Sequence, residues 1–349
     1  MGGEIEFDAS GVPMPQAGLS ETMCYGLTVP TGSLMPAGGW PVLIYAHGTG
    51  GNYRSFANSS LAAVFADLGF AVISFDNVMH GPRQNTSFDP ALWNDALWEF
   101  EEDGIGRLFF NVVNPRAARD NVLQGAADLF WLTRLLRSNP VLNTTATGDI
   151  KFDANQLYFF GHSQGTVIAA PYFAEETDLQ AAVFSGAGAD LALSILNKKE
   201  PVDLSQSTAL FLGDQGLSRI HPMIGLMGLL FGPSDALAYA SGLRRADGTA
   251  ITTPYLQFSG VGDSFTPDAT HAAMLEAMGV PIVGGGADVA LPGVVQVDQV
   301  PANRAGALRY VPDGAYNGHF VVFEHARSEQ ALRAFLGGAL NNGLAEISR

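Results

Sequence analysis

Ser163 is the central residue of a G-x-S-x-G pentapeptide, 161–165, a spacing that suits nucleophilic catalysis. An apolar run, 157–160, precedes the pentapeptide, and a pattern of small residues typical of a helix follows it. A serine on a sharp strand-to-helix turn has strained backbone angles, and side chains two positions to either side would collide, so glycines are needed there. The helix start also stabilises negative charge that develops near the hydroxyl. The context therefore predicts that Ser163 is a nucleophile.

A serine hydroxyl is a weak nucleophile unless a general base, usually histidine, takes its proton. The chain has seven histidines: His47, His80, His162, His221, His271, His319 and His325. We expect the base to be His319, because it follows the last apolar run, 307–311, near the end of the chain. Loops that follow parallel strands lie at the carboxyl edge of a sheet, where ligands bind. His325 is the fallback.

The base in turn needs a carboxylate that orients it. Asp263 belongs to a Gly-Val-Gly-Asp-Ser stretch that directly follows the apolar run 255–259, so we expect it to accept a hydrogen bond from His319. Asp268 and Asp288 are the weaker alternatives. The order Ser, Asp, His along the chain is expected for one hydrolase fold and for neither of the two well-known protease folds.

Acyl transfer also needs two N–H donors for the negatively charged oxygen of the tetrahedral intermediate. The backbone N–H of Gln164, directly after the nucleophile, is one candidate. The other is the N–H of Thr49, in the glycine-rich loop 47–51 that follows the apolar run 42–46. Glycines in this loop allow the backbone to approach a substrate closely.

The elements that must position these residues can be read from the apolar runs and the helical patterns between them. The runs predicted as strands are 42–46, 71–75, 157–160, 181–185, 255–259 and 307–311. The patterns predicted as helices are 56–68, 115–137 after a capping Asn114, and 329–336 after a capping Ser328. Continuous apolar strands joined by helices predict a mostly parallel sheet that is covered on both faces. We therefore expect one α/β domain over 1–349.

Two stretches, 84–111 and 188–253, do not fit this repeating unit and are predicted to be insertions. The second follows the fourth strand, so we expect it to form a helical cap above Ser163. Its apolar centre, 221–231, is too short to cross a bilayer. The four cap residues predicted to share one helical face and form an acyl-binding wall are Met223, Leu226, Leu230 and Phe231. The alternative is that this run only fills the core.

Composition excludes several classes of protein and partner. With 18 basic and 34 acidic residues the net charge is −16, so nucleic acid and anionic membrane surfaces are not expected as partners. A single cysteine, Cys24, excludes an internal disulfide and a cysteine-based metal site. The start of the chain has neither a basic segment nor an apolar segment typical of a signal peptide. An exported protein whose signal peptide has been trimmed is nevertheless favoured over a cytoplasmic one.

With these motifs the chain resembles the α/β-hydrolase superfamily, and within it the serine esterase and lipase group. The matching motifs are His47-Gly48-Thr49, the pentapeptide 161–165, the stretch 260–263 and Gly318-His319-Phe320. The stretches 36–41 and 119–121 are similar to bacterial exported lipase-like hydrolases. The resemblance implies that His47, Gly48 and His80 lie beside the nucleophile and contact substrate. A serine nucleophile argues against dehalogenases and epoxide hydrolases, which use aspartate.

The function that this resemblance implies is carboxylic ester hydrolysis through an acyl-enzyme, without a metal or cofactor. An apolar cap and 22 phenylalanines favour apolar acyl or aromatic esters, polyesters among them. Amide or peptide hydrolysis and acyl transfer would use the same residues, because the fold does not fix the leaving or accepting group. A non-catalytic binding protein with this fold is the alternative of another class. The oligomeric state stays open.

Overall fold

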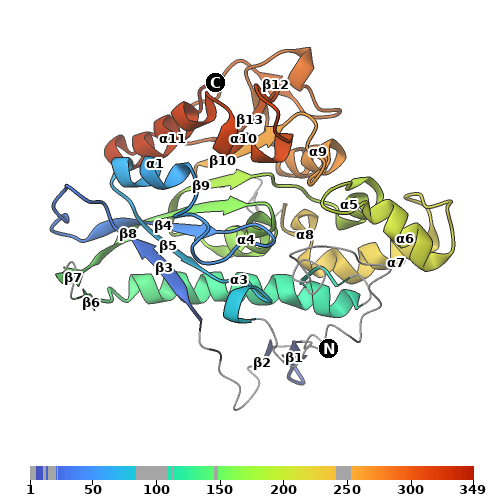
Figure 1. Ribbon diagram of the computed structural model, residues 1–349, viewed down its shortest axis with the longest axis horizontal. Helices are drawn as coiled ribbons and strands as arrows, with labels where there is room; N and C mark the ends of the chain where they lie inside the picture. Colours follow the sequence, from blue (N-terminus) through green and yellow to red (C-terminus); the bar gives the residue numbers. More distant parts are fainter. Residues whose placement is uncertain are drawn as a thin grey trace.

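The computed structural model describes residues 5–10, 13–14, 21, 23–83, 109–111, 114–144, 148–240 and 253–349. Within these residues, nine strands form one central sheet (Figure 1). In sheet order they are β12 (Gln296–Val297), β11 (Ile282–Val283), β13 (Ala305–Tyr310), β10 (Tyr255–Gly260), β9 (Leu179–Ser185), β8 (Phe152–His162), β4 (Trp40–Ala46), β5 (Ala71–Phe75) and β3 (Tyr25–Thr28). Only β3 among them runs antiparallel to its neighbour.

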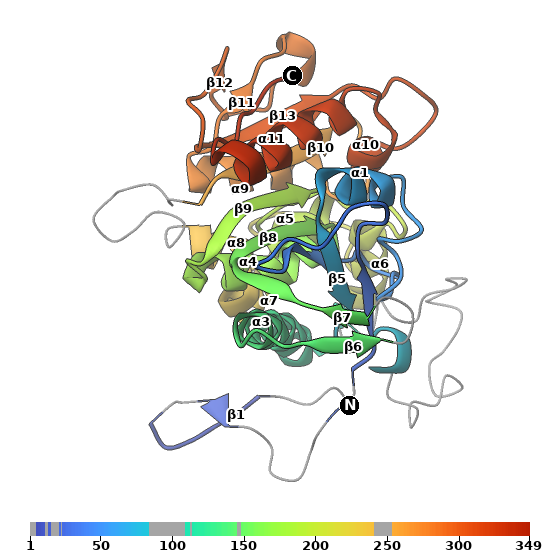
Figure 2. The same ribbon diagram turned by 90° about the vertical axis from the view of Figure 1, so that its left-hand side faces the viewer.

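Helices cover both faces of this sheet, as Figures 1 and 2 show. The helices on one face are α3 (Pro115–Arg137), α4 (Gln164–Glu175), α8 (Ala236–Ala240) and α9 (Asp268–Met278). Those on the other face are α1 (Leu61–Leu68), α10 (Val321–Glu324) and α11 (Ser328–Asn342). Side chains of a strand alternate between the two faces. Val42 and Ile44 of β4 accordingly pack with the first group, and Leu43 and Tyr45 pack with the second.

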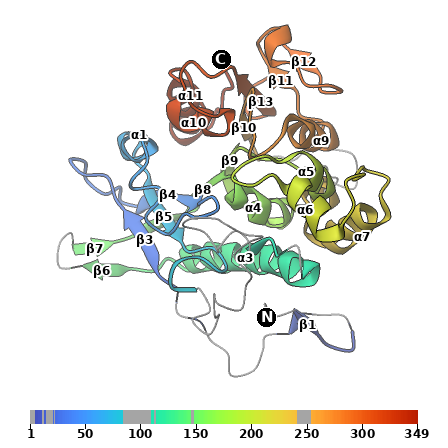
Figure 3. The same cartoon turned by 45° about the vertical axis from the view of Figure 1, so that its right-hand side comes forward.

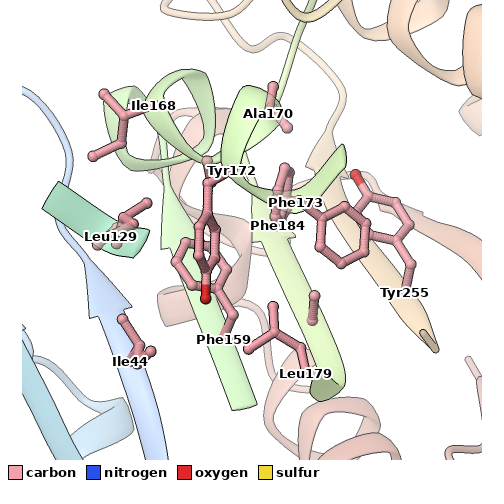
Figure 4. Packing of buried hydrophobic residues seen from close by; sticks show 14 of the residues in the cluster. Ile44, Leu129, Phe159, Ile168, Ala170, Tyr172, Phe173, Leu179, Phe184 and Tyr255 are labelled. Atoms are coloured by element: carbon pink, nitrogen blue, oxygen red, sulfur yellow. The ribbon is translucent and has the colours of Figure 1, made fainter. Parts of the chain in front are cut away.

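The larger core lies between the sheet and helices α3 and α4 (Figure 4). Tyr172 of α4 packs against Phe159 of β8, and its hydroxyl hydrogen-bonds Thr133 of α3 at 2.7 Å. This bond satisfies the one polar group that the ring brings into the core. This contact joins α3 to α4 and β8, the two elements between which Ser163 lies.

The six predicted strands are all present, and the mostly parallel α/β architecture is confirmed. Three strands of the sheet, β3, β11 and β12, were not predicted. Two of them have only two residues, and β3 is partly exposed, so none carries a continuous buried apolar run. Two small hairpins also lie outside the prediction, β1–β2 (Glu6–Phe7, Pro13–Met14) and β6–β7 (Leu142–Thr144, Gly148–Ile150).

The helix boundaries match the prediction at α3, where the side chain of Asn114 accepts a hydrogen bond from the N–H of Ala117 at 3.3 Å. Three other boundaries differ, one of them the end of α11, which runs to Asn342 beyond the predicted 336. Helix α1 begins at Leu61, because residues 53–60 form turns in which Phe56 is buried. Ser328 is the first residue of α11 rather than its cap, and its hydroxyl donates to the carbonyl of His325.

The predicted cap, 188–253, contributes a group of short helices at one end of the molecule (Figure 3). They are α5 (Leu191–Asn197), α6 (Leu204–Leu212), α7 (Pro222–Phe231) and η4 (Gly232–Ser234), followed by α8. Residues 241–252 lie outside the described residues, as do 84–108 of the smaller predicted insertion. Short 3-10 turns complete the chain at η1 (Gly81–Arg83), η5 (Ala287–Val289) and η6 (Gly318–Phe320). In the described part, no helix combines the length and apolarity that a membrane crossing requires.

Candidate active site

Ser163 lies between the last residue of β8 and the first residue of α4. Its backbone has φ 51° and ψ −119°, a conformation that costs a non-glycine residue about 1–3 kcal/mol. Both sides of the turn are hydrogen-bonded. The Ser163 N–H donates to the carbonyl of Ser185 at 2.8 Å, and its carbonyl accepts from the N–H of Thr166 at 2.8 Å. The neighbouring strand and the helix together hold the strained residue in place.

The two glycines of the pentapeptide are required by close packing. A Cβ at Gly165 would lie 2.1 Å from the carbonyl oxygen of Ala46, at the end of β4. A Cβ at Gly161 would lie 2.9 Å from the ring of Phe159 and 3.2 Å from the carbonyl of Gly165. Any side chain at these positions would push α4 away from the sheet, so the pentapeptide pattern has a steric cause in this chain.

Asp263 follows β10, and its buried carboxylate accepts four hydrogen bonds. The backbone N–H groups of Phe265 and Thr266 donate to Oδ1 at 2.9 and 2.7 Å. Ring nitrogens of His319 and His271 lie 2.9 and 3.2 Å from Oδ2. Burial alone would raise the pKa of Asp263, but hydrogen bonds from the two histidines outweigh it and hold the pKa well below its usual range. The carboxylate is therefore ionised.

His319 lies in η6, in the loop that follows β13. The side chain of Asn317 accepts from its backbone N–H at 3.0 Å, and the ring stacks on Phe265 with centroids 4.9 Å apart. Nδ1 faces Asp263, which places the ring proton on that nitrogen and leaves the lone pair of Nε2 free to act as a base. Burial lowers the pKa of His319 despite the neighbouring carboxylate. The ring is therefore neutral near pH 7.

Ser163 and His319 line the same cavity. Within the described residues no hydrogen bond joins the two side chains. Nucleophile–base contacts are often looser in the absence of a ligand. Gly186, after β9, leaves room for the base, since a Cβ there would lie 2.6 Å from its ring. The structure thus brings the three predicted side chains to one place, with the Asp–His contact formed.

The alternatives considered for the acid and the base lie elsewhere. Asp268 accepts a hydrogen bond from Arg309 at 2.8 Å, and Asp288 is an exposed residue of η5. His325 stacks on Tyr310 and lies 3.8 Å from Asp313. None of the three lines the cavity within the described residues.

His271, on α9, is a member of the site that the sequence analysis did not select. Its Nδ1 lies 2.7 Å from the carbonyl oxygen of Ala187, and its Nε2 lies 3.2 Å from Asp263. The ring is completely buried. The available signal was its position one helical turn after Pro267, close to Asp263 in the sequence, because a histidine on the buried face of that turn must find polar partners.

The residues of the two predicted oxyanion donors, Thr49 and Gln164, both line the cavity and contact each other. The hydroxyl of Thr49 donates to Oε1 of Gln164 at 2.9 Å. Gln164 is the first residue of α4, so its backbone N–H has no acceptor within the helix. Among the residues described, the backbone N–H of Thr49 has no acceptor either. Two free N–H groups beside Ser163 are what an oxyanion site requires.

His47 and His80 support the loop 47–51 and do not line the cavity, so their predicted contact with substrate is corrected. Both side chains are fully buried. Nε2 of His47 accepts from the N–H of Asn77 at 3.0 Å, and Nε2 of His80 accepts from the N–H of Gly50 at 3.2 Å. Burial lowers the two pKa values to about 3 and about 4, so both rings are neutral acceptors. Gly48 does line the cavity, and a Cβ added to it would lie 3.1 Å from the Cβ of Ser163.

The cavity above Ser163 has a volume of about 540 Å³ and mostly apolar walls. Among its lining residues are Phe110, Val122, Val167, Leu191, Ile195, Phe231, Phe265, Phe320 and Phe323. Of the four predicted wall residues only Phe231 is among them. Met223 and Leu226 are 36% and 45% exposed, and Leu230 is half-buried.

The buried face of α7 differs from the predicted one. It consists of Ile224, Met227 and Phe231, which pack with Ala118 of α3 and Ile195 of α5. Ten residues that are almost all apolar give no periodicity from which the buried face could be chosen. In the part of the chain that the structure describes, no group of three or more His, Cys, Asp or Glu side chains is placed to hold a metal ion.

Comparison with known proteins gives the fold. The chain is similar to an acetyl xylan esterase from Paenibacillus sp. R4, with 16% identity, a TM-score of 0.53, and coverage of 95% of this chain and 81% of that one. It is also similar to a 2,6-dihydroxy-pseudo-oxynicotine hydrolase (15% identity, TM-score 0.53, 99% and 70% coverage). A third similar structure is acetyl xylan esterase 1 from Thermoanaerobacterium sp. JW/SL YS485, with 16% identity, a TM-score of 0.51, and coverage of 91% of this chain and 80% of that one. No family model and no curated protein matches the chain.

These neighbours and the sheet order confirm the predicted fold class: the chain has the α/β-hydrolase fold. At 15–16% identity the likeness extends to the fold alone.

Proposed function

We propose that the protein is a serine hydrolase of carboxylic esters. The observation that carries the proposal is the arrangement at one cavity of a strained Ser163, a buried Asp263–His319 pair with its hydrogen bond formed at 2.9 Å, and two free backbone N–H groups. Each of these features costs stability or needs special packing, and acyl transfer uses all of them together.

In the first half of the reaction, Nε2 of His319 takes the proton of the Ser163 hydroxyl as its oxygen attacks the ester carbonyl carbon. The carbonyl oxygen becomes an oxyanion, which accepts hydrogen bonds from the N–H groups of Thr49 and Gln164. The imidazolium of His319 is stabilised by Asp263. It then protonates the leaving alkoxide, the carbon–oxygen bond breaks, and an acyl-enzyme remains on Ser163.

In the second half, water replaces the alcohol. His319 takes a proton from water, the hydroxide adds to the acyl carbonyl, and the same two N–H groups hold the new oxyanion. Its collapse breaks the bond to the Ser163 oxygen, which recovers its proton from His319. The products are one carboxylic acid and one alcohol, and the enzyme returns to its starting state.

The walls of the cavity support an apolar acyl or aromatic ester as substrate. Side chains from the cap (Leu191, Ile195, Phe231) face side chains from the sheet edge (Phe265, Phe320). Each methylene buried between them contributes about 0.8 kcal/mol. The same machinery serves amide hydrolysis and acyl transfer, so the assay must compare leaving groups and acceptors.

The test is hydrolysis of p-nitrophenyl esters from acetate to decanoate, with the matching anilides and an added alcohol acceptor as further arms. We expect the esters to be the best substrates and Ser163→Ala to lose several orders of magnitude in kcat. Ser138→Ala, a change of the same type at an exposed serine after α3, serves as the control.

A fluorophosphonate probe gives a second readout, because it labels an activated serine without any turnover. Labelling of the wild type and of Ser138→Ala, and not of Ser163→Ala, is expected. Labelling that persists in Ser163→Ala would mean that another residue is the nucleophile. No labelling of the wild type would favour a non-catalytic binding protein.

A further inference from the structure

A single lysine, Lys198, lines the cavity that contains Ser163. It directly follows α5, so it belongs to the cap. Its ammonium group donates a hydrogen bond to the carbonyl oxygen of Phe265 at 2.8 Å and lies 5.6 Å from the centre of the Phe265 ring. An ammonium group has three N–H donors. Among the described residues the ammonium group has only this one acceptor. Lys198 as a residue is half-buried at the cavity wall.

Within the described residues, no carboxylate forms an ion pair with this ammonium group. The chain contains 34 acidic residues, yet none of them is among the described residues that line the cavity. The acidic side chains closest in sequence have other partners. Asp203 pairs with Lys199 at 2.8 Å, and Glu200 accepts from Ser264 at 2.7 Å and from Asn317 at 3.1 Å.

Asp263 attracts Lys198 electrostatically, but its oxygens already receive four hydrogen bonds. The other titratable group at the sheet edge that interacts electrostatically with the lysine is His319, which carries no negative charge. Burial lowers the pKa of Lys198 to about 8, so below that pH the ammonium form predominates. The described walls of the cavity therefore present one cation and no anion to a substrate.

We propose, on the basis of the ester hydrolase function above, that Lys198 binds a carboxylate on the substrate, and that the preferred substrates are half-esters of dicarboxylic acids. The ester group would lie at Ser163 and the methylene chain against the apolar walls. The free carboxylate would accept the two remaining N–H bonds of Lys198. A charge-assisted hydrogen bond in a partly buried site is stronger than a neutral one. The site thus combines apolar walls with one anion-binding point from the cap.

The experiment compares two esters that differ in charge and hardly in shape. Monomethyl adipate ends in a carboxylate, and methyl 6-methylheptanoate has an isopropyl group in its place. Methanol release gives kcat/KM for each, and their ratio is the measured quantity. Lys198→Gln removes the charge and keeps a side-chain donor for Phe265, and Lys198→Met removes both. Lys199→Gln is the matched control, because Lys199 is exposed and pairs with Asp203.

We expect the ratio to fall by at least about tenfold in both Lys198 variants, as befits loss of a charge-assisted hydrogen bond, and to stay unchanged in Lys199→Gln. A ratio that is the same in the wild type and in the Lys198 variants would overturn the proposal. A parallel loss on both esters would overturn it too, because Lys198 would then act on the fold or on the triad.

A binding measurement separates this proposal from the proposed function. In a Ser163→Ala background, calorimetry compares adipate with 6-methylheptanoate, with Lys198 present or changed to Gln. Tighter binding of adipate that depends on Lys198 supports the anion site even if no ester is hydrolysed. Adipate binding that does not depend on Lys198 contradicts the site, whereas hydrolysis of the uncharged ester would leave the proposed function intact.

Discussion

His271 and His319 contact the same oxygen, Oδ2, of Asp263, at 3.2 and 2.9 Å. His271 also faces the carbonyl oxygen of Ala187 through its other ring nitrogen, at 2.7 Å. A neutral imidazole has one N–H, so both contacts of His271 are hydrogen bonds only when the ring carries two protons. His271 also lowers the pKa of His319 electrostatically. We interpret His271 as a positioning residue that fixes Asp263 and moderates its effect on the base.

The first prediction concerns His271→Asn. The imidazole of His271 lowers the pKa of His319 electrostatically, so its removal should raise that pKa. The acid limb of kcat/KM should therefore move to higher pH. The free energy of unfolding should fall by about 1–3 kcal/mol, since a buried acceptor loses its donor. His325→Asn, outside the cavity, is the control. An acid limb that stays in place while stability falls would mean that His271 is structural only.

The second prediction concerns the wild-type pH profile. The base must be neutral to accept a proton from Ser163, and burial lowers the pKa of His319 below the ordinary value of 6.5. Activity should therefore be present above that pKa and be lost as the pH falls through it, with the midpoint of the acid limb below pH 6.5. The measurement is kcat/KM on an uncharged ester from pH 4 to 8. A midpoint at or above 7 would contradict this assignment of the base.

The third prediction tests the strain at the nucleophile. Glycine adopts the backbone angles of Ser163 without steric cost, so Ser163→Gly should be more stable than Ser163→Ala by about 1 kcal/mol. Chemical denaturation gives the two free energies. The same pair of changes at Ser207, inside α6, should have the opposite sign, because glycine weakens a helix. Equal stability of the two Ser163 variants would argue against strain at the turn.

The fourth prediction concerns stability against pH. His47 and His80 have pKa values lowered to about 3 and about 4, against an ordinary value of 6.5. The unfolded chain therefore binds more protons than the folded one between these values and 6.5, and the free energy of unfolding should fall as the pH drops through this window. The lowered pKa of Asp263 adds to the loss only below its usual value of 3.8. Denaturant midpoints from pH 7 to 4.5 measure the effect.

The control for this prediction is His80→Gln, which keeps an acceptor for the N–H of Gly50 and does not titrate. Its stability should depend less steeply on pH than that of the wild type. An identical dependence in both proteins would show that His80 is not one of the groups responsible.

The sequence contained enough information for the central strands and the nucleophile turn. Strands such as β4 and β10 are buried on both faces, which makes most of their residues apolar, and the glycines of 161–165 reflect contacts that leave no space for a Cβ. Asp263 and His319 could be selected because each follows a buried strand.

The parts that could not be predicted depend on contacts between distant segments. His271 meets Asp263 and Ala187 only through the packing of α9 against the sheet. The buried face of α7 depends on where α3 and α5 lie, and its apolar sequence gives no preference. The sequence around Lys198 does not distinguish it from other lysines that follow a helix. Its position at the cavity wall is known only from the structure. The roles of His47 and His80 were similarly fixed by partners on another loop.

The cavity is lined by loops at the sheet edge, by the start of α3 and by the cap segment. Sheet-edge loops supply Ser163, His319 and the N–H donors, whereas the cap segment after β9 supplies Leu191, Lys198 and Phe231. The residues proposed to react and a large part of the cavity wall therefore come from different segments of the sequence. A chimaera that exchanges residues 190–240 for a foreign cap would be expected to hydrolyse a new range of esters with the old chemistry. The contact between Lys198 and the carbonyl of Phe265 is one junction that the exchange would have to preserve.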